Sequence, residues 1–309
     1  MLDRLSPNAL GSLYMTLGTL AFVINDGLIR LATEQGLDVY QALFLRGCAM
    51  VVIFVALTKQ RGEPIDRRLL SRPLLVRLAC EVVGTALFFA GLIRLEFANA
   101  QTILMLTPFV VTLVAARRLG ERVSRLSWLI VVIGFAGVLA VVRPTPEEFS
   151  AASLLIVAAA LALTVREFAT RRVDPDLSPL PIALMTAVAI TSMMGLISLF
   201  TGWGTITQRS LVYLGFATVC LVAGYLFVIQ TVRVGDLSAT APFRYTAVVF
   251  AVIVGLAFFN ETPDALTWIG CAVIVVAGIW SARLDAGRQA GAAMSADAGL
   301  SVFEEPAAR

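Results

Sequence analysis

Residues 120–128 read Gly-Glu-Arg-Val-Ser-Arg-Leu-Ser-Trp, and residues 260–268 read Asn-Glu-Thr-Pro-Asp-Ala-Leu-Thr-Trp. In each stretch a glutamate is followed seven residues later by a tryptophan. Two further landmarks recur at nearly the same offset of about 140 residues: Gly11-Ser12-Leu13 corresponds to Ala152-Ser153-Leu154, and Asn25-Asp26 corresponds to Arg166-Glu167. Self-similarity at one offset indicates an internal repeat. The chain is therefore predicted to contain two copies of one structural unit.

Each copy holds five apolar stretches of the length that crosses a bilayer, which takes about 20 apolar residues. The predicted spans cover residues 10–29, 39–57, 74–93, 98–116, 128–142, 152–168, 181–200, 211–231, 238–259 and 265–281. Because five is odd, the second copy enters the membrane from the opposite side, as in the inverted repeats of secondary transporters. We expect an all-α membrane protein with ten transmembrane helices in two inverted five-helix repeats, residues 1–145 and 146–284, followed by a disordered tail, residues 285–309.

The composition supports a membrane protein. Of 309 residues, 59% are hydrophobic and 15% are charged, and the mean hydropathy is +0.87. Soluble domains average about 45–50% apolar and about 25% charged residues. The basic residues are dispersed among the predicted loops, which gives no indication of nucleic-acid binding. The partners expected instead are the lipid bilayer and a small molecule.

Several kinds of chemistry are made improbable by residues that the sequence lacks. It has no histidine, which removes imidazole bases and histidine-ligated metals. Its four cysteines lie in apolar runs without CxxC spacing, so neither a zinc site nor a disulfide framework is indicated. It also has no GxxxxGK[ST] phosphate-binding motif. We therefore expect no enzyme activity, no metal and no cofactor, and transport that does not use ATP directly.

The distribution of basic residues predicts the orientation. With the N-terminus in the cytoplasm, the inner loops hold Lys59, Arg61, Arg67, Arg68, Arg72, Arg117, Arg118, Arg122, Arg125, Arg171, Arg172 and Arg233. The outer loops hold Arg30, Arg94, Arg143 and Arg209. Cytoplasmic loops carry an excess of Lys and Arg. A bacterial-type inner membrane with both termini in the cytoplasm is predicted.

Ionisable residues inside spans are costly and mark candidate functional sites. Asp26 and Arg46 lie at similar depth in the first two spans, so they form a candidate gating pair, or a pair that only fixes helix packing. Glu81 has Arg77 four residues earlier on the same helix face, and its depth makes it a candidate proton carrier. Protons are accordingly the candidate coupling ion.

The second copy offers a mirrored set. Glu167 and Arg244 match the depths of Asp26 and Arg46 and are predicted to pair as the opposite gate. Pro108 and Pro242 interrupt apolar spans and free backbone carbonyls, which suits a substrate site or a packing kink. Aromatic residues at mid-depth could stack on a flat ligand or pack between helices: Phe88, Phe89, Phe109, Phe243 and Tyr245.

The sequence resembles the drug/metabolite transporter superfamily, EamA type, over about residues 10–282. The residues that carry the resemblance are Asn25-Asp26 before Leu28-Ile29-Arg30, Phe44-Leu45-Arg46, the Pro108 span ending in Leu119-Gly120-Glu121-Arg122, and Trp268-Ile269-Gly270 with Gly278. It departs from the usual pattern at Phe259-Asn260-Glu261, where a Gly commonly precedes the Glu. The resemblance implies ten helices in two inverted repeats, a central cavity lined by both halves, and exchange of metabolites such as amino acids, nucleobase-like compounds or vitamins.

The function expected is secondary transport of a small organic metabolite, by a monomer or a homodimer. Phe44-Leu45-Arg46 and Val142-Arg143-Pro144 look similar to a subgroup with riboflavin transporters and nucleoside-like metabolite carriers, which favours a planar heteroaromatic substrate. The alternative is an exporter of amino acids or drugs with the same fold. A membrane receptor or assembly factor would be expected to carry a soluble module, and an intramembrane enzyme would need a nucleophile with a base or paired carboxylates.

Overall fold

The computed structural model describes residues 7–118, 125–142, 150–234, 240–277, 279–280 and 283. Within these ranges the chain is helical and has no strand. Six helices are long and apolar enough to cross a membrane. They are α1 (Pro7–Glu34), α2 (Val39–Gln60), α3 (Arg72–Leu92), α7 (Ala151–Thr170), α8 (Pro179–Thr201) and α9 (Gln208–Val234).

Shorter apolar helices account for the four remaining predicted spans. The fourth span consists of α4 (Phe97–Leu104) and α5 (Leu106–Arg118), and the fifth is α6 (Arg125–Val142). The ninth consists of the 3-10 helix η3 (Ala241–Tyr245) and α11 (Thr246–Phe259), and the last is the helix Ala265–Ala277. The prediction of an all-α membrane protein with ten spans is confirmed. The predicted tail, residues 285–309, lies outside the described residues.

The fourth span is interrupted close to Pro108, as the sequence suggested. The helix ends at Leu104 and restarts at Leu106, with Met105 between them. Pro108 has no backbone N–H for the carbonyl of Leu104, four residues earlier. The Thr107 hydroxyl donates to that carbonyl instead, at 2.9 Å. A proline together with a hydroxyl side chain therefore explains the break.

The ninth span has a corresponding discontinuity, where η3 gives way to α11 between Tyr245 and Thr246. Tyr245 follows Met105 by 140 residues, which is the offset of the internal repeat. Pro242 lies in the first turn of η3, between the helical residue Thr240 and the start of α11. Both copies thus change helix geometry at equivalent positions.

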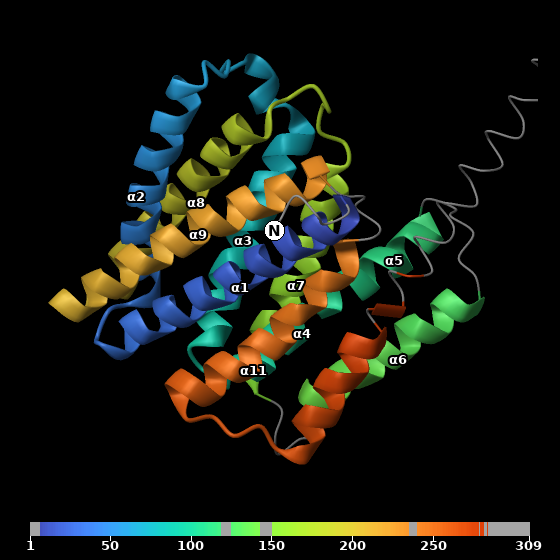
Figure 1. Cartoon of the computed structure of the whole chain (residues 1–309). Coiled ribbons are helices and arrows are strands. Elements are labelled where there is room, and N and C mark those ends of the chain that lie inside the picture. The colour runs from blue at the N-terminus through green and yellow to red at the C-terminus, as the bar shows by residue number, and fades with distance from the viewer. Residues whose placement is uncertain are drawn as a thin grey trace, which may run out of the picture.

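Helices from the two halves alternate in space, so neither half is a separate bundle (Figure 1). The closest helix pairs are α1 with α9, α3 with α7, and α2 with α8. The first span of each copy therefore packs on the third span of the other, while the two second spans pack together. An inverted two-fold relation between the copies requires this pattern. The core is formed jointly by the two copies.

Glycines allow α3 and α7 to approach closely. A Cβ at Gly91 would lie 2.6 Å from Ile156 Cδ1 and 2.9 Å from the carbonyl oxygen of Ala152. A Cβ at Gly84 would lie 2.9 Å from Leu163 Cδ2. Small residues at such contacts let helix backbones pack tightly in membranes. This close packing brings the charged residues of α3 and α7 within bonding distance.

Candidate functional site

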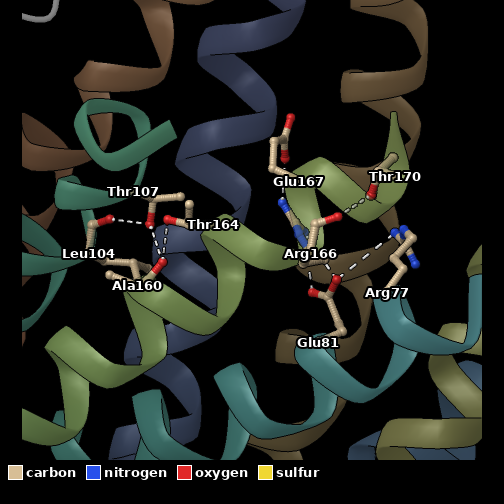
Figure 2. Close-up of polar contacts among 9 residues, drawn as sticks. All are labelled: Arg77, Glu81, Leu104, Thr107, Ala160, Thr164, Arg166, Glu167 and Thr170. Atoms are coloured by element: carbon tan, nitrogen blue, oxygen red, sulfur yellow. Dashed lines mark hydrogen bonds and ion pairs between the residues drawn. The ribbon is translucent and has the colours of Figure 1, made fainter. Parts of the chain in front are cut away.

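Four charged residues meet between α3 and α7, and we call them the α3–α7 cluster: Arg77, Glu81, Arg166 and Glu167. Arg166 Nη1 donates to Glu81 Oε2 at 3.1 Å and to Oε1 at 3.4 Å, and Nη2 donates to Glu167 Oε2 at 3.1 Å. Arg77 Nη2 lies 3.9 Å from Glu81 Oε2. Figure 2 shows Glu81 between the two arginines. The cluster joins the two halves of the chain.

Glu81 has more partners than the sequence indicated. Its pairing with Arg77, predicted from their spacing of four residues, is confirmed. The contact with Arg166 was not foreseen, because it depends on the packing of α3 against α7. Arg77 also donates to the Thr186 hydroxyl on α8 at 2.8 Å. The Glu81 side chain is only 12% exposed, so the carboxylate is held between two cations in the interior.

The expected pair of Glu167 with Arg244 is wrong. Glu167 bonds to its neighbour Arg166, and no ion pair between Glu167 and Arg244 occurs in the described part of the chain. The Arg244 side chain is exposed at the end of η3. The two residues were predicted to pair only because they lie at similar depths in their spans, and depth does not determine the direction of a side chain.

A second set of polar residues connects α1, α2 and α4, and we call it the α1–α2–α4 cluster: Asn25, Asp26, Arg46 and Gln101. Arg46 Nη1 donates to Asn25 Oδ1 at 3.0 Å, and Asn25 Nδ2 donates to Asp26 Oδ1 at 2.9 Å. Gln101 Nε2 donates to Asp26 Oδ2 at 2.7 Å. The predicted direct pairing of Asp26 with Arg46 is corrected, because the Asn25 amide bridges them.

Two residues of this region were missed by the sequence reasoning. Gln101 could have been noticed, since it is a polar side chain inside an apolar span. Tyr225 on α9 interacts electrostatically with Arg46 and also with Glu81 and Arg166. Its ring makes edge contacts with Phe22 and Phe54 at centroid distances of 5.6 and 6.0 Å. Tyr225 therefore lies near charged residues of both clusters.

The break in the fourth span is attached to the helix that carries Arg166. Besides bonding to Leu104, the Thr107 hydroxyl lies 3.4 Å from the carbonyl oxygen of Ala160 on α7. Thr164 donates to the same oxygen at 2.8 Å (Figure 2). Thr107 therefore connects the break in the fourth span to α7.

The aromatic residues predicted at mid-depth have different environments. Phe109 and Tyr245 are 3% and 6% exposed, and their rings lie 6.3 Å apart. This contact joins the discontinuities of the fourth and ninth spans. Phe88 and Phe89 pack edge to face at 5.2 Å, whereas Phe243 is exposed. The side chains of Pro108 and Pro242 lie outside the described residues.

A third set of contacts lies at the end of the helices where α1 and α11 finish, and we call it the α1–α11 joint. Arg30 Nη2 lies 2.7 Å from Glu261 Oε1, and Nη1 donates to the carbonyl of Leu95 at 3.0 Å. The Arg30 guanidinium also lies 4.3 Å from the centroid of the Phe259 ring. Glu261 Oε2 accepts the backbone N–H of Phe97, the first residue of α4, at 2.6 Å. The repeated glutamate of the sequence thus holds the start of α4.

At the opposite end, an exposed ion pair joins two loops. Arg68 of the 3-10 helix η2 (Arg67–Leu70) pairs with Asp66 and, at 3.1 Å, with Asp174 after α7. The hydrogen bond from Arg68 holds the pKa of the Asp66 carboxyl below its usual value. Exposed pairs contribute little to stability. This contact mainly shows which loops are neighbours.

Comparison with known proteins gives a consistent result over the whole helical region. The model of the EamA-like transporter family matches twice, at residues 9–143 and 150–282. The pseudopaline exporter CntI of Pseudomonas aeruginosa is 27% identical over 283 residues, which cover 90% of this chain and 97% of the exporter. A solved crystal structure with 19% sequence identity superposes with a TM-score of 0.62, covering 87% of this chain and 98% of that chain. That likeness shows the fold.

Two other relatives carry different substrate names. The riboflavin transporter of Rhizobium johnstonii is 26% identical, with 70% of this chain and 71% of the relative covered. The S-adenosylmethionine uptake transporter of Rickettsia prowazekii is 25% identical, with 64% of this chain and 69% of the relative covered. All three named relatives are transporters of small molecules, and they differ in substrate and in direction.

Proposed function

Because the chain belongs to the EamA-like transporter family, we propose that it is a secondary transporter that moves a small organic metabolite by alternating access, without ATP. The observation that carries the proposal is the polar region between the halves. The α3–α7 and α1–α2–α4 clusters draw charged residues from both copies into a helical interior. Ionisable groups at such positions typically mark substrate or ion pathways.

The proposed alternation uses the two interrupted spans. Discontinuous helices at corresponding positions of two inverted halves are the usual location of a transporter's binding site. Here the interruptions at Met105 and Tyr245 adjoin through the contact of Phe109 with Tyr245. We propose that α4 and η3 move relative to α5 and α11, opening the region between the clusters to one side at a time. The two halves would then correspond to residues 1–145 and 146–284, as the sequence suggested.

For the substrate we propose a planar heteroaromatic metabolite, such as riboflavin or a nucleobase-like compound. The riboflavin transporter among the relatives supports this choice. The exporter among the relatives supports the second candidate, export of amino acids or drugs. A secondary carrier runs in the direction that its gradients dictate, so one site serves either direction. Protons are the proposed coupling ion. Glu81, and after it Asp26, are the interior carboxylates that we propose to carry them.

A ligand screen tests the choice of substrate. Purified protein is heated with vitamins, nucleobases, amino acids and common drugs, and its unfolding midpoint is recorded. A ligand that binds the folded state raises the free energy of unfolding, by about 2.7 kcal/mol at a concentration 100 times its Kd. The unfolding midpoint rises with it. We expect the largest shifts from planar heteroaromatic compounds. Larger shifts from amino acids would favour the second candidate.

The orientation is a separate prediction. We expect a reporter fused after Arg283 to signal the cytoplasm and one inserted near Glu147 to signal the periplasm of a bacterial inner membrane, because basic residues follow the positive-inside rule. Paired alkaline-phosphatase and fluorescent-protein fusions measure this. A periplasmic signal from the fusion after Arg283 would contradict the orientation.

A further inference from the structure

Arg46 is a buried cation that makes no direct ion pair with a carboxylate in the described part of the chain. Arg46 belongs to α2, and the residue is only 6% exposed. In the described part of the chain no carboxylate oxygen lies within 4 Å of it, whereas Arg77 and Arg166 both contact Glu81. Arg46 Nε is buried without a hydrogen-bond partner. A buried charge in a membrane helix is costly unless something pairs with it.

Asp26 does not contact Arg46 directly, because its oxygens bond to other donors. Oδ1 accepts from Asn25 and Oδ2 accepts from Gln101. The Asn25 amide is oriented by its two neighbours, since its oxygen accepts from Arg46 Nη1 while its nitrogen donates to Asp26. The unsatisfied hydrogen-bonding capacity of the α1–α2–α4 cluster is therefore donor capacity on the guanidinium. Such a site suits an anionic group and not a cation.

The geometry of arginine narrows the choice of anion. Nη1 bonds to Asn25, and Nε is the buried donor without a partner. Nε and Nη2 point from the same edge of the guanidinium, and such an edge matches two oxygens of one carboxylate. Asp26 is a second acidic group near Arg46, which disfavours a doubly charged phosphate. The Phe89 ring lies 5.9 Å from the Arg46 guanidinium, which places an aromatic surface beside the site. A single carboxylate on an aromatic compound fits these features.

We propose that Arg46, oriented by Asn25, binds a carboxylate of the transported metabolite. This inference rests on the proposed transport function and adds the chemical class of the substrate. A substrate carboxylate would accept hydrogen bonds from the free edge of the guanidinium, so Arg46 Nε would have a partner only when the carrier is loaded. Among planar heteroaromatic compounds, the site then selects those with a carboxylate over their neutral amides.

Matched probe pairs test the proposal with the full chain in detergent. The pairs are nicotinate with nicotinamide, orotate with uracil, and benzoate with benzamide, and the readout is the unfolding midpoint as a function of ligand concentration. We expect the carboxylate to bind better than its neutral partner in at least one pair. In Arg46→Gln that carboxylate should bind about ten- to a hundredfold more weakly, as expected for loss of hydrogen bonds to a charged group.

Two further variants keep the test decisive. Arg46→Lys retains the positive charge but cannot form two parallel hydrogen bonds to one carboxylate, so it should bind the carboxylate with intermediate affinity. Undiminished affinity in this variant would overturn the bidentate site. Arg68→Gln makes the same chemical change at an exposed arginine and should leave the preference intact. If Arg46→Gln does not fold, the lysine variant alone decides.

The outcomes also separate this inference from the transport function. Equal shifts from both members of every pair, or a larger shift with inorganic phosphate than with any carboxylate, overturn the carboxylate site. If a neutral compound is nevertheless transported in proteoliposomes, the proposed transport function stands without the carboxylate site. A complete lack of flux for every compound in the ligand screen would contradict transport itself.

Discussion

Glu81→Gln is expected to destabilise the folded protein by about 3–5 kcal/mol, because it removes one partner of a buried ion cluster. The α3–α7 cluster contains two arginines and two glutamates, and Glu81 contacts both arginines. Glutamine leaves Arg77 and Arg166 with Glu167 as the remaining carboxylate of the cluster. The excess positive charge would lie between α3 and α7, whose packing joins the two halves. We expect a large fall in the thermal midpoint and loss of transport.

Restoring charge balance should recover much of this loss. In the double variant Glu81→Gln with Arg166→Gln, one arginine and one glutamate remain, so the midpoint should rise above that of Glu81→Gln. Non-additivity of this kind is the signature of a direct interaction. Glu96→Gln, at an exposed glutamate, serves as the control and should leave the midpoint unchanged. A Glu81→Gln protein with the wild-type midpoint would show that the cluster does not stabilise the packing of α3 on α7.

Arg30→Gln is expected to open the α1–α11 joint. Arg30 contacts Glu261, Leu95 and Phe259 together, and Glu261 in turn holds the N-terminus of α4. Without the guanidinium, Glu261 is left buried without a cation, and the first turn of α4 loses its anchor. Hydrogen bonds to charged groups contribute about 1.5–3 kcal/mol. The population of the conformation with the joint open should rise by about ten- to a hundredfold.

Cys271 is a built-in reporter of this opening. It is 5% exposed, and its Sγ lies 3.4 Å from the Thr102 hydroxyl of α4, so α4 covers it. With Cys48, Cys80 and Cys220 replaced by alanine, N-ethylmaleimide should modify Cys271 faster in Arg30→Gln than in the parent protein. Arg94→Gln is the matched control, since Arg94 is exposed and bonds to the nearby Ala90 carbonyl at the end of α3. Equal rates in the parent and Arg30→Gln would show that the joint does not control α4.

The sequence was sufficient for features that depend on local pattern. Apolar length predicted the ten spans, and the spacing of Arg77 and Glu81 predicted their contact, because residues four apart share a helix face. The repeated glutamates at 121 and 261 predicted two related halves. At Glu261 the structure adds the reason, since its carboxylate connects Arg30 to the first turn of α4.

Contacts between helices could not be deduced in the same way. The contact of Glu81 with Arg166 requires α3 to pack on α7, which hydropathy does not encode. Asp26 and Arg46 have suitable depths, yet Asn25 bridges them, because a one-residue difference on a helix changes direction by about 100 degrees. The break at Met105 arises from the combination of Pro108 with Thr107, whose hydroxyl replaces the missing donor.

Counterflow in proteoliposomes tests the central claim, secondary transport through the region between the halves, most directly. Vesicles without ATP are loaded with an excess of one unlabelled compound from the ligand screen, and entry of the same labelled compound is followed. We predict transient, saturable accumulation for at least one compound that raises the unfolding midpoint, and its loss in Glu81→Gln. Labelled compound that only equilibrates at the rate of protein-free vesicles, for every stabilising ligand, would contradict the account.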